Sequence, residues 1–154
     1  MSVRARLAAS LMLTVYAATV SATEHTVTAV GQRGHELMFF EPNFLRVAPG
    51  DTVTFAVDDF DHQPQSVFVP PGASPWQAEK GQSITVELTV EGVYIFDCAY
   101  HNVMGMTGVI VVGEATNLAA AREFYAAYRD ETVLINKTLL DPVWRATASL
   151  SQGQ

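Results

Sequence analysis

Alternation of polar and apolar residues is the main pattern in the first two thirds of this chain of 154 residues. It is clearest over residues 52–57 (TVTFAV) and 83–88 (SITVEL), and it is weaker over residues 25–30. Alternation over four to eight residues is typical of a strand with one face in a core. Each of these segments is therefore predicted to be a half-buried strand.

Short apolar runs provide further strand candidates at residues 37–40, 44–47, 93–96 and 109–112. Gly and Pro residues separate them, as in the pairs Pro49-Gly50 and Pro71-Gly72. Short strands divided by such turn signals are typical of two packed sheets. The fold class predicted for residues 23–113 is therefore all-β, as a β-sandwich.

The pattern changes after residue 113, where apolar side chains recur every three or four positions. This period predicts a helix that begins after Asn117, with the Asn side chain as its N-cap. A second helical run is predicted over residues 131–144, interrupted by Pro142. Neither run shows residues with obvious chemistry, so we expect residues 113–154 to form a helical C-terminal extension packed on the sandwich. The periodic apolar residues of the first run are Leu118, Ala121, Phe124, Tyr125 and Tyr128.

The N-terminus has the organisation of a secretory signal peptide. Residues 1–6 carry two arginines, residues 7–20 are apolar, and Val20-Ser21-Ala22 provides small residues for cleavage after Ala22. An apolar stretch of this length is too short to span a bilayer as a helix. We therefore expect residues 1–22 to be removed, and residues 23–154 to be one soluble domain with no permanent membrane anchor.

The charge of the chain excludes one class of partner. Removing residues 1–22 takes away Arg4 and Arg6 but no carboxylate, so the formal net charge changes from −7 to −9. A domain this acidic has no basic face for nucleic acid.

The chain has one cysteine, Cys98, which cannot form an internal disulfide. In an exported protein a free thiol is exposed to oxidation unless it is buried and inert or bound to a metal. His101 follows it by three residues, and Met104 and Met106 lie just beyond. A thiolate, an imidazole and a thioether on one loop are typical ligands of copper. Either methionine could supply the thioether.

A second imidazole is available from His62, which follows the strand predicted at residues 52–57. Two His, one Cys and a weak axial Met form the blue-copper arrangement that transfers electrons. His25 and His35 lie in the N-terminal segment, where surface or strand-end positions are the simpler interpretation.

Taken together, these motifs resemble those of the pseudoazurins, small periplasmic blue copper proteins of the cupredoxin family. The resemblance rests on the Cys98, His101 and Met106 spacing, on the upstream His62, and on the run from Phe40-Glu41-Pro42 to residue 55. It extends over roughly residues 25–113.

The resemblance implies a Greek-key β-sandwich that binds one copper ion cycling between Cu(I) and Cu(II). The implied ligands are His62, Cys98, His101 and Met106. It also implies a periplasmic, monomeric electron carrier, not an enzyme, whose partners are redox proteins such as a cytochrome c or a periplasmic reductase. Met38 corresponds to a methionine that packs beside the exposed ligand His in this family, although ordinary core packing explains it equally well.

The chain departs from the family pattern beside the ligands. Gln63 stands where Asn is common, so its longer side chain must find another partner. Tyr100 stands where Pro is common, and its N–H is a candidate donor to the Cys98 sulfur, which would tune the potential.

The loop before His62 carries Asp58, Asp59 and Asp61, where familiar relatives surround the exposed His with lysines. The acidic loop either favours a basic partner or is only solvated surface.

Three functional classes fit these observations: an electron carrier, a copper storage or delivery protein, and a binding module without redox chemistry. Four protein ligands leave no open position for a substrate, whereas catalytic metal sites keep one. A complete ligand set therefore favours the electron carrier, and copper storage or delivery is the alternative.

Overall fold

The computed structural model describes residues 22–58, 61–138 and 140–148. Most of the predicted signal peptide, residues 1–21, lies outside the described residues. Among the helices in the described ranges, none combines the length and the apolar character needed to cross a bilayer.

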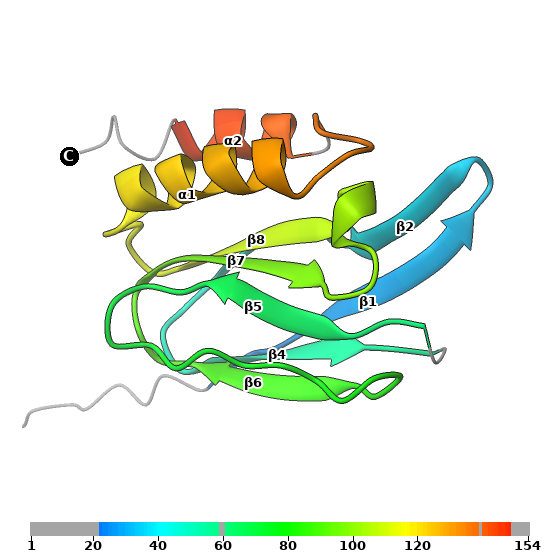
Figure 1. Cartoon of the computed structure of the whole chain (residues 1–154). Coiled ribbons are helices and arrows are strands. Elements are labelled where there is room, and N and C mark those ends of the chain that lie inside the picture. The colour runs from blue at the N-terminus through cyan, green and yellow to red at the C-terminus, as the bar shows by residue number, and fades with distance from the viewer. Residues whose placement is uncertain (1–21, 59–60, 139, 149–154) are drawn as a thin grey trace, which may run out of the picture.

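Two four-stranded sheets pack face to face, which confirms the predicted β-sandwich (Figure 1). The first sheet has the order β2 (Glu36–Glu41), β1 (Glu24–Arg33), β4 (Asp51–Ala56) and β6 (Ile84–Leu88). The second has the order β3 (Phe44–Val47), β8 (Thr107–Val112), β7 (Gly92–Cys98) and β5 (Pro64–Phe68). Strands β1 and β4 pair in parallel, as do β3 and β8, so the chain crosses between the sheets.

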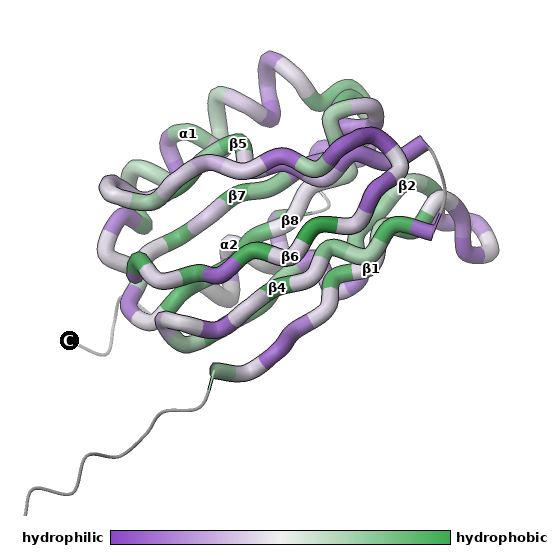
Figure 2. Tube along the Cα trace, turned by 90° about the horizontal axis from the view of Figure 1, so that it is seen from below, coloured by the Kyte–Doolittle hydropathy of each residue, from purple (hydrophilic) through white to green (hydrophobic). Residues whose placement is uncertain are grey.

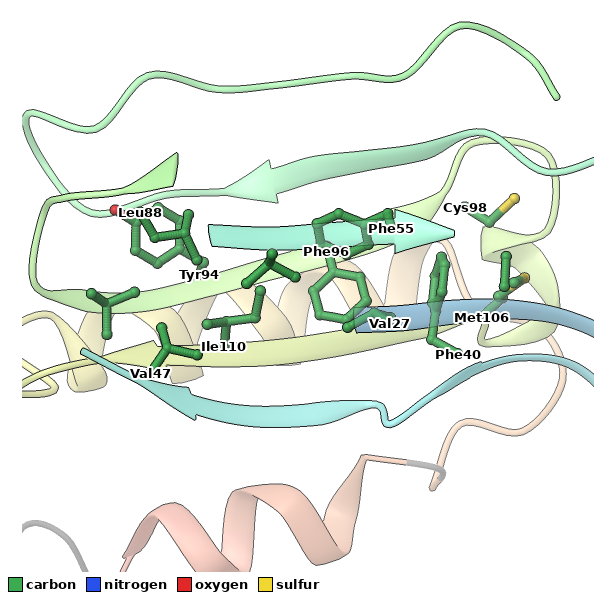
Figure 3. Packing of buried hydrophobic residues seen from close by; sticks show 13 residues of the cluster. Val27, Phe40, Val47, Phe55, Leu88, Tyr94, Phe96, Cys98, Met106 and Ile110 are labelled. Atoms are coloured by element: carbon green, nitrogen blue, oxygen red, sulfur yellow. The ribbon is translucent and has the colours of Figure 1, made fainter. Parts of the chain in front are cut away.

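The core between the sheets is built from the side chains that alternation places inward. In β4 these are Asp51, Val53 and Phe55, which are buried, while the residues between them are partly exposed. Phe96 of β7 lies with its ring centroid 5.0 Å from that of Phe55 and 5.0 Å from that of Phe40. Figure 3 shows Phe55 and Phe96 in the middle of the core, with Phe40 nearer the end that carries Met106 and Cys98. The alternation of polar and apolar residues in this segment thus matches the alternation of buried and partly exposed side chains in β4.

A second apolar layer covers the outer face of the second sheet. Helices α1 (Leu118–Glu131) and α2 (Asp141–Ala148) lie over β7 and β8 (Figure 1). Both strands are therefore buried along their whole length, which explains their continuous apolar runs. By contrast, the tip of the hairpin that joins β1 and β2 is hydrophilic (Figure 2).

The C-terminal extension differs from the prediction in two ways. The second helical run was predicted over residues 131–144 with an interruption at Pro142, but residues 132–138 form turns and irregular structure, and α2 begins only at Asp141. Pro142 lies in the first turn of α2, where its missing N–H costs no helical hydrogen bond.

The second difference concerns Asn117, which holds the N-cap position of α1 without a capping side-chain hydrogen bond. Its Oδ1 accepts from the Val93 amide at 2.6 Å, and its Nδ2 donates to the Val93 carbonyl at 3.1 Å. Its side chain therefore anchors the start of the helix to β7.

Asp51 fastens the start of β1 to the sandwich. Its carboxylate accepts the amides of Thr23 and Ala48, each at 2.8 Å, and lies 3.0 Å from Nε2 of His25. The amide of Thr23, followed by the His25 ring and the Ala48 amide, lowers the pKa of Asp51. His25 thus lies near the start of β1, as a strand-end histidine, and the structure adds that its ring is bound to the Asp51 carboxylate.

Candidate metal centre

Strand pairing brings His62 and Cys98 together from separate parts of the chain. Cys98 is the last residue of β7 and pairs with Pro64, the first residue of β5. The pairing continues beyond the strands, because the Ala99 amide donates to the Gln63 carbonyl at 3.0 Å. His62 lies just before this paired segment, so the register of β5 and β7 places its imidazole near the thiol.

The segment from Cys98 to Met106 folds back on itself. The Cys98 amide donates to the Met106 carbonyl at 3.0 Å, and the His101 amide donates to the Cys98 carbonyl at 3.0 Å. A short 3-10 helix, η1 (Asn102–Met104), follows and ends at Gly105 in the left-handed conformation (φ 80°). We call residues 98–106 the ligand loop.

Three of the four predicted ligands meet in this structure. The donor atoms of His62, Cys98 and His101 all lie within 4.8 Å of one another. The Cys98 sulfur is 3.7 Å from Nδ1 of His62 and 3.5 Å from Nδ1 of His101. His62 and Cys98 are fully buried, whereas His101 is half-buried. One soft sulfur facing two imidazole nitrogens is a donor set that suits copper.

The two candidate methionines occupy different surroundings. Met106 is fully buried in the same core cluster as Cys98. Figure 3 shows these two residues at the same end of the core. Met104 is half-buried and lines a cleft of about 720 Å³ together with Leu37, Phe39 and Ile135. Burial beside the thiol therefore favours Met106 as the thioether donor.

The residues that depart from the family pattern have definite partners. The Gln63 amide donates to the Cys98 sulfur at 3.4 Å, and its side-chain Nε2 donates to the Ala78 carbonyl at 2.8 Å. The backbone donor to the sulfur is thus Gln63. In the described residues, the Tyr100 amide makes no such bond. The Tyr100 ring is instead exposed and lies 4.6 Å from the Lys80 ammonium.

The irregular segment after α1 packs on the ligand loop. The amides of Leu134 and Ile135 both donate to the Val103 carbonyl, at 2.8 and 3.1 Å. Nδ2 of Asn136 donates to the Met104 carbonyl at 3.2 Å. We call residues 134–136 the C-terminal brace, because they hold the outer side of the ligand loop.

Asp97, immediately before the thiol, was missed by the sequence analysis. Its carboxylate is fully buried and accepts hydrogen bonds from the Tyr128 hydroxyl and from Nε2 of Gln65 at 2.9 Å. Burial raises the pKa of Asp97, and hydrogen bonds from Tyr128, Gln65 and Asn102 partly offset this. The sequence did contain a signal, since Asp97 directly follows the apolar run of residues 93–96. A carboxylate buried at the end of such a strand requires hydrogen-bond partners.

The remaining candidates lie away from the cluster or beside it. His35 is exposed and lines the cleft near Met104. Met38 is half-buried against the core cluster that contains Cys98. Asp58 and Asp61 are exposed, and Asp59 lies outside the described residues.

Comparisons with known proteins agree with this geometry. The family model of copper binding proteins, plastocyanin/azurin family, matches residues 25–113. A pseudoazurin from Methylorubrum extorquens is 35% identical over 124 residues, which cover 77% of this chain and 84% of the relative. A pseudoazurin from Paracoccus pantotrophus is 34% identical over 118 residues, covering 75% and 81%.

A solved structure also matches over most of its length. The crystal structure of pseudoazurin from Methylobacterium extorquens superposes with a TM-score of 0.68 at 32% identity, covering 80% of this chain and 98% of that one. Family match, identity and fold lead to the same conclusion: this chain belongs to the plastocyanin/azurin family of copper-binding proteins, and within it is a pseudoazurin-like cupredoxin.

Proposed function

We propose that His62, Cys98, His101 and Met106 hold one copper ion, and that the protein carries single electrons between redox proteins of the periplasm. The observation that carries this proposal is the convergence of a buried thiol and two imidazoles within 4.8 Å. Bound copper supplies a one-electron couple between Cu(I) and Cu(II).

The burial of the donor residues supports a carrier over storage or delivery. Cys98 and His62 are fully buried, and Met106 closes the same end of the core. A protein that hands metal to another protein needs donors that the receiving site can reach. An electron carrier instead needs ligands that keep their positions when the charge of the site changes. The hydrogen bonds that close the ligand loop meet that need.

His101 is the proposed point where electrons enter and leave, because it is the only one of the three clustered donor residues that is partly exposed. Exposed apolar side chains lie beside it on the ligand loop and the C-terminal brace. Val103 is 43% exposed, Leu134 is 72% exposed, and Ile135 is 54% exposed. A partner that covers this apolar surface would bury apolar area close to His101.

Charge supports a basic partner. The chain has a formal net charge of −7, and the exposed Asp58 and Asp61 precede the buried His62. Complementary charge increases the rate of encounter between proteins. The proposed partner is therefore a basic redox protein such as a cytochrome c.

The visible spectrum of the copper-loaded protein tests the proposal. The expected result is an intense colour from charge transfer between the Cys98 thiolate and Cu(II), with one copper bound per chain. Cys98→Ser should lose the colour, and the exposed Ser74→Ala serves as a control that should keep it. A colourless copper complex of the unaltered protein would reject the electron-carrier proposal.

A further inference from the structure

The two faces of β7 point to different layers of the molecule. Tyr94, Phe96 and Cys98 belong to the core between the sheets, whereas Val93 and Ile95 belong to the cluster under the helices. Successive side chains of a strand point to opposite faces. Asp97 therefore lies on the helix side of the strand, directly next to the residue that carries the thiol.

Two structural elements in the described residues donate hydrogen bonds to this carboxylate. Gln65 donates from β5 at 2.9 Å, and Tyr128 donates from α1. Without Asp97, these two elements would share no acceptor at the end of β7 that carries Cys98.

The donor geometry of Gln65 is itself fixed. Its Oε1 accepts a hydrogen bond from Nε2 of Gln77 at 2.6 Å, which leaves its own NH₂ group for Asp97. The amide orientation is thus determined by two partners on opposite sides. A buried acceptor whose donors are oriented in this way fixes positions better than one that meets mobile groups.

We propose that Asp97 is a positioning residue for the metal centre: through Tyr128 and Gln65 it holds the start of the ligand loop, at Cys98, in a fixed position against helix α1 and strand β5. The inference rests on the proposed function only where it concerns copper, because the positioning of the loop is a property of the chain itself. Tyr128 acts through Asp97 and does not contact the proposed ligands in any hydrogen bond of the described structure.

Tyr128→Phe tests this inference, and Tyr94→Phe is its matched control. Each substitution removes one tyrosine hydroxyl that donates a hydrogen bond: Tyr128 donates to Asp97, and Tyr94 donates to the Val90 carbonyl at 2.8 Å. Tyr94 lies on the same strand, at the opposite end of the core from Cys98 (Figure 3). A general loss of stability would affect both variants, whereas a positioning effect would appear only in Tyr128→Phe.

The first measurement needs no metal. In the full-length apoprotein, hydrogen exchange of the amides in residues 99–106 should be at least threefold faster in Tyr128→Phe than in Tyr94→Phe. Equal exchange in the two variants would overturn the inference, even if the unaltered protein forms a coloured copper site. If the unaltered protein gives a colourless complex, the proposed function fails and this measurement still decides the positioning role.

The second measurement uses the copper-loaded protein. Tyr128→Phe should change the relative intensities of the visible bands and release copper to a chelator at least threefold faster than Tyr94→Phe. Asp97→Asn, which keeps the shape of the side chain, should produce a similar or larger change. Since Tyr128 is proposed to act through Asp97, the double variant should be no worse than Asp97→Asn alone. Additive effects of the two substitutions would contradict the proposed route.

Discussion

Gly105→Ala is the most informative single substitution at the junction of the ligand loop and the C-terminal brace. Gly105 has a φ of 80°, in the left-handed region that favours glycine. A Cβ there would lie 2.9 Å from the Ile135 carbonyl oxygen and 3.1 Å from that of Asn136. Both obstacles are backbone atoms, so the brace would have to move as a unit.

The size of the effect follows from a comparison with Gly72. Gly72 has a φ of 90°, and no atom lies within 4 Å of the position that a Cβ would occupy, so Gly72→Ala meets only the backbone cost. That cost is roughly 1–2 kcal/mol, less about 0.4–1 kcal/mol for the stiffer unfolded chain. At Gly105 the shifted brace also disrupts the two hydrogen bonds that the Leu134 and Ile135 amides donate to the Val103 carbonyl, each worth about 0.5–1.5 kcal/mol. Gly105→Ala should therefore cost about 1–3 kcal/mol more than Gly72→Ala.

Urea unfolding of the two apoproteins measures this difference without a contribution from metal binding. Equal m-values would show that the two variants expose the same surface on unfolding. A difference below about 0.5 kcal/mol would refute the reasoning, because it would mean that the brace adapts to the methyl group at no cost. In the copper-loaded protein, Gly105→Ala should also alter the visible spectrum, since the next residue is the proposed thioether ligand.

Met106→Leu should keep copper but shift the potential, because the axial ligand tunes the site without holding it; a larger shift in Met104→Leu, measured by the same redox titration, would transfer the axial role to Met104. Changing Asp58 and Asp61 together to Asn should slow electron exchange with a cationic cytochrome at low salt and lose this effect near physiological ionic strength, where charges beyond about 8–10 Å are screened. Unchanged stopped-flow rates at low salt would show that the acidic loop is only solvated surface. The pKa of the Asp51 carboxyl is lower in the folded protein than in the unfolded chain. Its stabilisation of the fold is therefore fully present above its pKa in the unfolded chain, and is lost as the pH falls through its pKa in the folded protein. The destabilisation by Asp51→Asn should therefore be present at neutral pH and shrink on acidification in urea titrations at several pH values.

Local patterns predicted most of the sandwich, and the exceptions have physical causes. Strand β3 occupies the predicted residues 44–47, and the alternation at residues 52–57 became β4. Strand β5 was missed because it begins with Pro64 and continues through the polar Gln65 and Ser66. Such a sequence is tolerated in a strand at the edge of its sheet, and edge position is a property of the whole fold.

The site shows the same division between local and long-range information. The spacing of Cys98, His101 and Met106 lies within one loop and could be read directly. The partnership of Asp97 with Tyr128 joins residues separated by 31 positions, and no local pattern encodes it. The helical period of the extension predicted which residues of α1 face the sheet. It could not predict that one of them, Tyr128, reaches the end of β7 beside Cys98.

The C-terminal brace also determines the order in which the molecule can be completed. A ribosome makes the chain from its N-terminus, so the ligand loop at residues 98–106 is synthesised before residues 134–136 exist. The hydrogen bonds from Leu134 and Ile135 to Val103 therefore form only after residue 135 has been made. A chain truncated before residue 134 would thus keep all four proposed ligands and lose the outer support of the ligand loop.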